Sequence, residues 1–257
     1  MANSKLETVS LEWTYSPKDY FEEPIKIEND QYVLEINSGD VRITMDSVVF
    51  NQDSNIHKRL ERKVLAHFLG CQVTSCKIFN FSGSRVIRNH SNENGAIFLK
   101  IEDEVKIQDS ADVITQDTHG KTIGDTKSDR MREQREFAGL SAKYSEDDAL
   151  EAMLLSNHAS VNDPDNAFIH LYEIREILSK RFCGEKNAKE KLMISRADWS
   201  RLGKLSNDEP IKQGRHRGKN FESSRDATEE ELKEARQIVK NLIKRYIDYL
   251  DGESSVS

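Results

Sequence analysis

Apolar residues recur at every second position along much of the first part of the chain. The pattern is followed over 32–36, 41–45 and 97–101. Period-two alternation places one side of a strand on a core and the other side in water, which is typical of antiparallel sheets. Residues 9–108 are therefore predicted to form mostly antiparallel strands.

One segment within this region has a helical period instead. Ser54 is a suitable N-cap before it, and Gly70 is a suitable stop after it. Four apolar residues recur between them at every fourth position: Ile56, Leu60, Val64 and Phe68. We expect a helix packed on the sheet, so residues 1–108 are predicted to be an α+β domain.

From about Ser145 the pattern is helical. Asn162-Asp163-Pro164 places a capping side chain before a proline at the first helical position. One apolar stripe follows it: Ala167, Leu171, Ile174 and Leu178. The pattern predicts a C-terminal all-α helical bundle over 145–257.

The last helix has the strongest signal in the chain. Thr228 and Glu231 have the spacing of a capping box, in which each side chain binds the other residue's backbone N–H. An apolar stripe follows at steps of three and four: Leu232, Ala235, Val239, Leu242, Tyr246 and Tyr249. We interpret this stripe as the core-facing side of a bundle helix.

Residues 109–144 join the two halves. They begin polar and become a mixed-charge stretch at Lys127–Glu136, which predicts a polar linker with a short solvated helix. The predicted fold class is α+β: an antiparallel-sheet domain with one packed helix over 1–108, this linker, and the helical bundle over 145–257.

Composition limits the classes of function. The chain has 257 residues, of which 32% are charged, and a net charge of −7. These values exclude a membrane-embedded protein and a protein that coats nucleic acid with its whole surface. Charge is segregated, however: residues 1–41 carry −6, whereas 42–100 carry +5 and 171–220 carry +6. Basic regions of this kind are candidates for local contact with phosphate.

No secretory signal or long apolar run is present, so we expect a cytoplasmic protein without membrane contact. Cys71, Cys76 and Cys183 form no C-x-x-C pair and are expected to be reduced thiols. We expect no metal site and no cofactor.

Residues 188–202 resemble a helix-turn-helix motif. Ser195 has the position of the N-cap of a recognition helix, and Arg196 and Arg201 would be placed on that helix. The turn position usually held by glycine carries Met193. A DNA-binding regulator using these arginines is therefore one hypothesis, and a motif used only for packing is its alternative.

The most distinctive stretch precedes the last helix. Arg215, His216 and Arg217 stand between two glycines, with Lys212 and Lys219 on either side. A histidine beside fixed cations is suited to phosphate contact or to acid–base chemistry. An exposed basic loop without a partner is the alternative.

The helical half resembles the HEPN superfamily of bacterial defence and toxin proteins over residues of about 146–250. The resemblance rests on the up-and-down helices, the polar segment at Asn207, Arg215-His216 and the long last helix. Catalytic members of that family cut RNA without metal, using an Arg and a His that are separated by four to six residues. Here positions 209–211, where that Arg would precede His216, hold Glu, Pro and Ile. The resemblance therefore favours a binding member of the family.

Our leading hypothesis is a binding component that contacts RNA or another phosphate-bearing ligand through Arg215, His216, Arg217 and Lys219. A metal-independent ribonuclease using Arg215 and His216, with Asn207 as an orienting residue, is a second hypothesis. The DNA-binding regulator and a scaffold whose first domain docks a protein partner are the others. The sequence leaves open whether His170 and Glu173, which share a helix face, lie near this loop. It also leaves open a symmetric dimer that would bring two such loops together.

Overall fold

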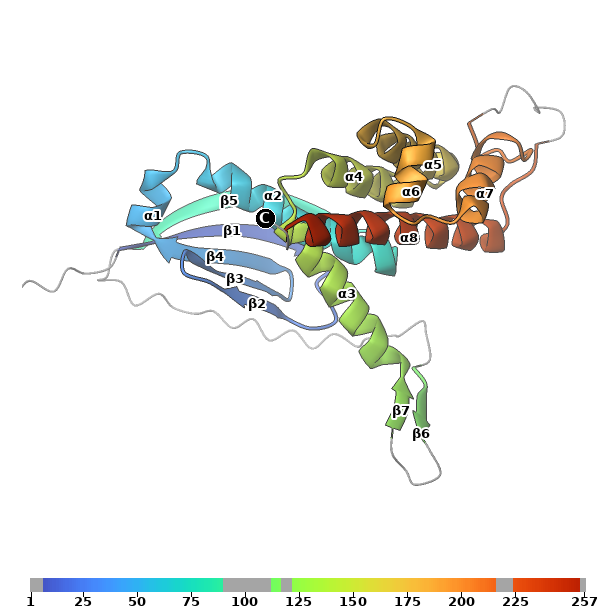
Figure 1. Cartoon of the computed structure of the whole chain (residues 1–257). Coiled ribbons are helices and arrows are strands. Elements are labelled where there is room, and N and C mark those ends of the chain that lie inside the picture. The colour runs from blue at the N-terminus through green and yellow to red at the C-terminus, as the bar shows by residue number, and fades with distance from the viewer. Residues whose placement is uncertain (1–6, 90–111, 117–121, 216–223, 255–257) are drawn as a thin grey trace, which may run out of the picture. The chain divides into compact units, whose positions relative to one another are not determined.

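The computed structural model describes residues 7–89, 112–116, 122–215 and 224–254. The chain divides into two compact units. The sheet unit comprises Met1–Lys58 and Phe79–Glu133, and the helical unit comprises Arg59–Ile78 and Gln134–Ser257. The predicted α+β class is confirmed, because an N-terminal antiparallel sheet is followed by a helical region (Figure 1).

The sheet has five antiparallel strands in the order β2-β3-β4-β1-β5. Their bounds are β1 Thr8–Ser16, β2 Ile25–Glu28, β3 Tyr32–Asn37, β4 Asp40–Asp46 and β5 Asn80–Asn89. The alternation predicted over 32–36 and 41–45 is confirmed, because every second residue there is buried. The third alternating segment, 97–101, lies outside the described residues.

The outer face of the sheet carries a row of alternating charges. Strand register places Glu12 opposite both Arg85 and Arg42, Arg42 opposite Glu35, and Glu35 opposite Lys26. Arg42 donates to Glu12 at 2.9 Å, and the Lys26 Nζ lies 3.8 Å from Glu35. Opposite charges in directly paired positions stabilise a sheet, so this row favours the observed register.

Short elements complete the sheet unit. Helix α1 (Ser47–Gln52) is capped by the Asp46 side chain, which accepts from the Val48 N–H. A small hairpin of β6 (Ile114–Gln116) and β7 (Thr122–Asp125) leads into α3 (Thr126–Lys143). Near the start of α3, Arg130 donates to Glu22 and Asp112.

Helix α2 spans Ile56–Ser75, so the predicted stop at Gly70 is wrong. The four apolar residues expected to be buried are buried. Gly70 lies inside α2 at the point where α3 crosses it. A Cβ at this position would lie 2.6 Å from the Phe137 carbonyl oxygen and 2.6 Å from Ser141 Oγ. The glycine permits close helix packing and does not end the helix.

The helical unit contains the rest of α2 and α3 and five further α-helices. Their bounds are α4 Asp148–Asn162, α5 Ala167–Arg181, α6 Glu185–Lys191, α7 Arg196–Asn207 and α8 Glu229–Ser254, with a 3₁₀ turn, η1, at Pro164–Asn166. Helix α5 packs against α4, α6, α7 and α8. Its predicted apolar stripe is buried. The proline predicted at a first helical position is confirmed, because Pro164 begins η1 with Asp163 at the N-cap position. The predicted capping hydrogen bond is not formed: the Asp163 side chain makes none, and Asn162 ends α4.

The start of α4 is bonded to two other helices. Asp147 caps α4 by accepting from the Leu150 N–H, and it also accepts from the Tyr246 hydroxyl of α8. Arg181 of α5 donates to the same hydroxyl. Burial, the largest cause, raises the pKa of Tyr246 to about 12. The short solvated helix predicted in the mixed-charge stretch is longer in the structure, where α3 extends to Lys143 and one face of its second half is buried. In the described ranges, every helix is too short or too polar to cross a bilayer.

Candidate functional site

The loop between α7 and α8 begins and ends in ordered backbone pairing. The Arg215 N–H donates to the Ser206 carbonyl at 2.8 Å, which joins the loop to the end of α7. The backbone N–H of Lys212 donates to the Arg225 carbonyl, and the backbone N–H of Arg225 donates to the Pro210 carbonyl, both at 2.9 Å. The chain is thus paired with itself on either side of residues 216–223.

Arg225 also connects this pairing to the start of α8. Its guanidinium donates to both carboxylate oxygens of Glu231, at 2.7 and 2.8 Å. This hydrogen-bonded pair lowers the pKa of Glu231 to about 2. Glu231 also accepts from the Thr228 N–H, and the Thr228 hydroxyl accepts from the Glu231 N–H, so the predicted capping box is confirmed. One carboxylate therefore serves both the helix cap and the loop base.

Arg215 has a defined environment on α5. Its Nη1 donates to Glu176 at 2.8 Å, and its guanidinium carbon lies 4.5 Å from the centre of the Tyr172 ring. About a third of the side chain remains exposed. Within the described ranges, Nη1 is the one side-chain nitrogen of Arg215 that forms a hydrogen bond, so the edge formed by Nε and Nη2 has no described hydrogen-bond partner. A guanidinium edge of this kind is suited to two parallel hydrogen bonds to a phosphate.

Of the other residues predicted for this site, the structure describes Lys212 and Asn207. His216, Arg217 and Lys219 lie outside the described residues. Lys212 is exposed and lies 3.2 Å from Asp226. Asn207 is the last residue of α7 and follows Ser206, and its Oδ1 is buried without a hydrogen-bond partner among the described residues. The structure thus brings the Asn207 segment and Arg215 together through the Ser206 carbonyl.

The cap predicted for the second helix of the helix-turn-helix segment is confirmed. Ser195 caps α7 by accepting from the Ala197 and Asp198 N–H groups. Met193 has φ +50 in the turn, which is the left-handed conformation that glycine favours. Arg196 is exposed. Arg201 is hydrogen-bonded to Glu234 of α8, and this contact raises the pKa of the guanidinium.

His170 and Glu173 lie on a different flank of α5 from Tyr172 and Glu176, which contact Arg215. His170 contacts Glu173 at 3.5 Å and Asp163 at 3.4 Å. At 100° per residue, positions 170 and 173 lie on one side of the buried stripe, and 172 and 176 lie on the other. The pair is a local polar cluster on α5, and its contacts in the described chain are with neighbouring residues.

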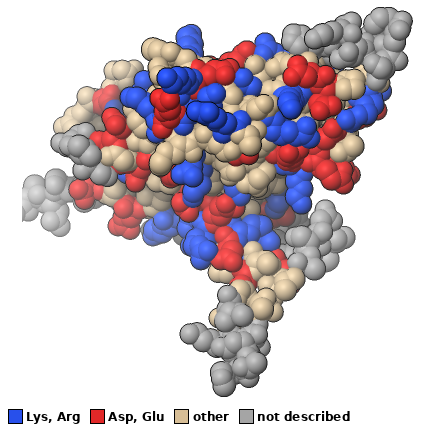
Figure 2. Space-filling view, turned by 45° about the vertical axis from the view of Figure 1, so that its right-hand side comes forward, with Lys and Arg blue, Asp and Glu red and all other residues tan. Residues whose placement is uncertain are grey.

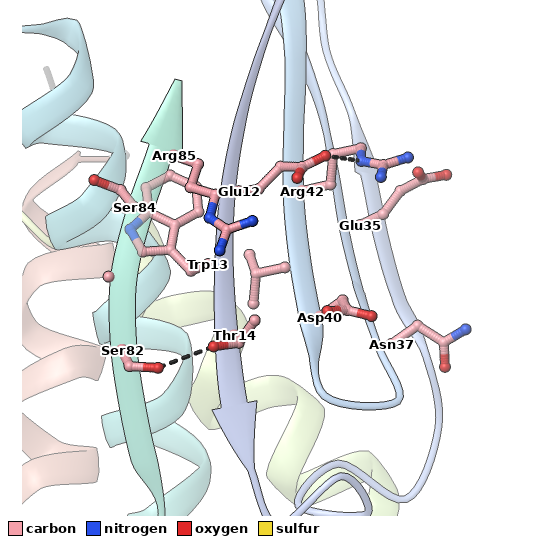
Figure 3. Close-up of a pocket in the computed structure, with 12 residues that line it drawn as sticks. Glu12, Trp13, Thr14, Glu35, Asn37, Asp40, Arg42, Ser82, Ser84 and Arg85 are labelled. Carbon is pink, nitrogen blue, oxygen red and sulfur yellow. Dashed lines mark hydrogen bonds and ion pairs between the residues drawn. The ribbon is translucent and has the colours of Figure 1, made fainter. Parts of the chain in front are cut away.

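Sequence reasoning missed a polar groove of about 700 Å³ on the sheet unit (Figure 3). It is lined by residues of β1, β3, β4 and β5, among them Glu12, Arg42 and Arg85. The Thr14 and Ser82 hydroxyls, which both line it, are 2.9 Å apart (Figure 3). These side chains come from strands that are distant in sequence, so no local signal could place them together. The groove can form hydrogen bonds to a polar ligand.

Positive and negative side chains are interspersed on the face of the molecule in Figure 2. In the described ranges, no cluster of three or more His, Cys, Asp or Glu residues could hold a metal ion. Comparison with protein-family models, curated proteins and solved structures finds no match for this chain.

Proposed function

We propose that the helical unit binds RNA, and that Arg215 at the base of the 216–223 loop is its central phosphate contact. The proposal follows from the resemblance of residues 146–250 to binding members of the HEPN superfamily and from the chemistry of this loop. A binding component of a bacterial defence or toxin system is the biological setting that this resemblance implies.

The observation that carries the proposal is the fixed base of the loop. Backbone pairing of Arg215 with Ser206 and of Lys212 with Arg225 holds both ends of a segment that contains His216, Arg217 and Lys219. A cationic segment with fixed ends loses less conformational entropy when it binds an anion than a free one does. The unpartnered edge of Arg215 supplies a geometry suited to one phosphate.

The test compares wild type, Arg215→Ala and Arg132→Ala for binding a labelled single-stranded RNA across a salt series. Arg132 is an exposed arginine of the sheet unit that also pairs with one carboxylate, so its variant removes the same charge from the other unit of the chain. We expect Arg215→Ala to weaken binding and to lower the salt slope by about 0.7, the value for one phosphate contact on a single strand. Arg132→Ala should leave both quantities at wild-type values.

Three outcomes would contradict the proposal. Wild-type protein that shows no RNA binding at low salt would remove it, and equal affinities for Arg215→Ala and wild type would move the contact elsewhere. RNA cleavage that continues in EDTA and is lost in a folded His216→Ala variant would identify the ribonuclease in place of the binding protein.

A further inference from the structure

A stack of alternating cations and aromatic rings extends from Arg215 into the helical unit. The guanidinium carbons of Arg215 and Arg175 lie 4.5 and 5.1 Å from the centre of the Tyr172 ring. Arg175 also lies 5.0 Å from the Trp199 ring, and Lys189 lies 5.8 Å from that ring. We call these five residues the cation–aromatic stack. It connects the loop base with α5, α6 and α7.

The middle of the stack is held by directed hydrogen bonds. Only 13% of the Arg175 side chain is exposed. Its Nη1 donates to the Trp199 carbonyl at 3.1 Å, and its Nη2 donates to Glu185 at 2.7 Å. The other Glu185 oxygen accepts from the Trp199 indole N–H at 3.0 Å. One carboxylate therefore fixes both the guanidinium and the ring on which it stacks.

Gly203 of α7 lies directly against the Arg175 guanidinium. A Cβ at Gly203 would collide with Arg175 Nη1, so a larger residue there would displace the guanidinium. The hydrogen bond from Arg175 is the largest cause that lowers the pKa of Glu185, which keeps this carboxylate ionised. Tyr172 thus stacks on a buried, charge-paired arginine whose position is set by α6 and α7.

We propose that Tyr172, held by Arg175 and Trp199, is a positioning residue that presents Arg215 to an RNA phosphate. The ring supports one face of the Arg215 guanidinium while Glu176 binds Nη1, so the Nε and Nη2 edge is directed away from both. An arginine that is already ordered pays less rotamer entropy on binding. This inference rests on the proposed RNA-binding function.

The experiment is a double-mutant cycle on the full chain with labelled single-stranded RNA. It uses Tyr172→Leu, Tyr172→Phe, Arg215→Ala and the double variant Tyr172→Leu/Arg215→Ala. We expect Tyr172→Leu to weaken binding by roughly 3- to 30-fold, the range for loss of a cation–aromatic contact. Tyr172→Phe retains an aromatic face and should bind within about twofold of wild type.

The cycle separates positioning from a general structural role. If Tyr172 acts through Arg215, Tyr172→Leu has no further effect on RNA affinity in the Arg215→Ala background. An equal loss in both backgrounds would overturn the inference, because Tyr172 would then stabilise the unit without reference to Arg215. Wild-type affinity for Tyr172→Leu, with Arg215→Ala weakened, would also overturn it while leaving the proposed function intact. Wild-type affinity for Arg215→Ala would overturn the proposed function itself.

Discussion

His67 of α2 gives a prediction about stability that is independent of any ligand. Its side chain is 2% exposed, and neither ring nitrogen has a hydrogen-bond partner among the described residues. Burial, together with the nearby positive charge of Lys63, lowers the pKa of His67 to about 4. The imidazole is therefore neutral in the folded protein at pH values where it would be protonated in the unfolded chain.

The sign and size follow from proton linkage. Between an ordinary histidine pKa near 6.5 and the folded value near 4, the unfolded state binds one more proton than the folded state. The free energy of unfolding therefore rises with pH through this window, and the contribution is fully present above about pH 6.5. The gap between the two pKa values corresponds to about 3 kcal/mol, which is lost as the pH falls to 4.

The assay is denaturant unfolding of wild type and His67→Leu at several values between about pH 4 and pH 7. Leucine is apolar and of similar volume, so it removes the titration and also an unpartnered N–H, and the variant should be at least as stable as wild type near pH 7. Between pH 7 and pH 4, the free energy of unfolding of wild type should fall by about 3 kcal/mol more than that of His67→Leu. Parallel pH profiles for the two proteins, or an NMR titration of His67 centred near 6.5, would refute the reasoning.

Three further predictions concern helix ends and helix crossings. Met193→Gly should raise the free energy of unfolding by about 0.5–1 kcal/mol, because glycine adopts the positive φ of this exposed turn without strain; thermal unfolding checks it, with Met193→Ala as a control that gains nothing. Gly70→Ala should cost about 1–3 kcal/mol in the same assay, since its Cβ would meet the Phe137 carbonyl. Arg225→Ala should raise the pKa of Glu231 from about 2 toward 4.5, so the stability that this carboxylate contributes above about pH 4.5, and loses as the pH falls toward 2, should become smaller; carboxyl NMR titration measures the shift, and an unchanged value would contradict the pairing.

Local patterns predicted those elements whose cause is local. The alternation over 32–36 and 41–45, the buried stripe of α5 and the Thr228–Glu231 capping box all depend on residues a few positions apart. The stop at Gly70 failed because the role of that glycine depends on α3, a helix more than sixty positions later in the chain. A glycine inside a helix and a glycine after one look alike when the crossing helix is unknown.

The same distinction applies to the candidate site. The sequence drew attention to Arg215 through its neighbours His216 and Arg217, because an Arg-His-Arg run between glycines is a local feature. It gave no indication that Tyr172 and Glu176 of α5 contact Arg215. The sequence also gave no indication of the close contact between Arg175 and Gly203, because this contact depends on how α5 packs against α7.

The net charge of a chain segment does not show how strongly its surface attracts phosphate. Residues 171–220 carry an excess of six positive charges, yet Arg175, Arg201 and Arg215 each bind a carboxylate of Glu185, Glu234 or Glu176. A paired guanidinium adds little to the attraction of a distant phosphate, because its field is largely cancelled beyond the pair. Binding at this surface must therefore depend on specific hydrogen bonds at short range. The salt slope of Arg215→Ala tests this point, because a decrease of about 0.7 requires that Arg215 itself neutralises a phosphate by direct contact.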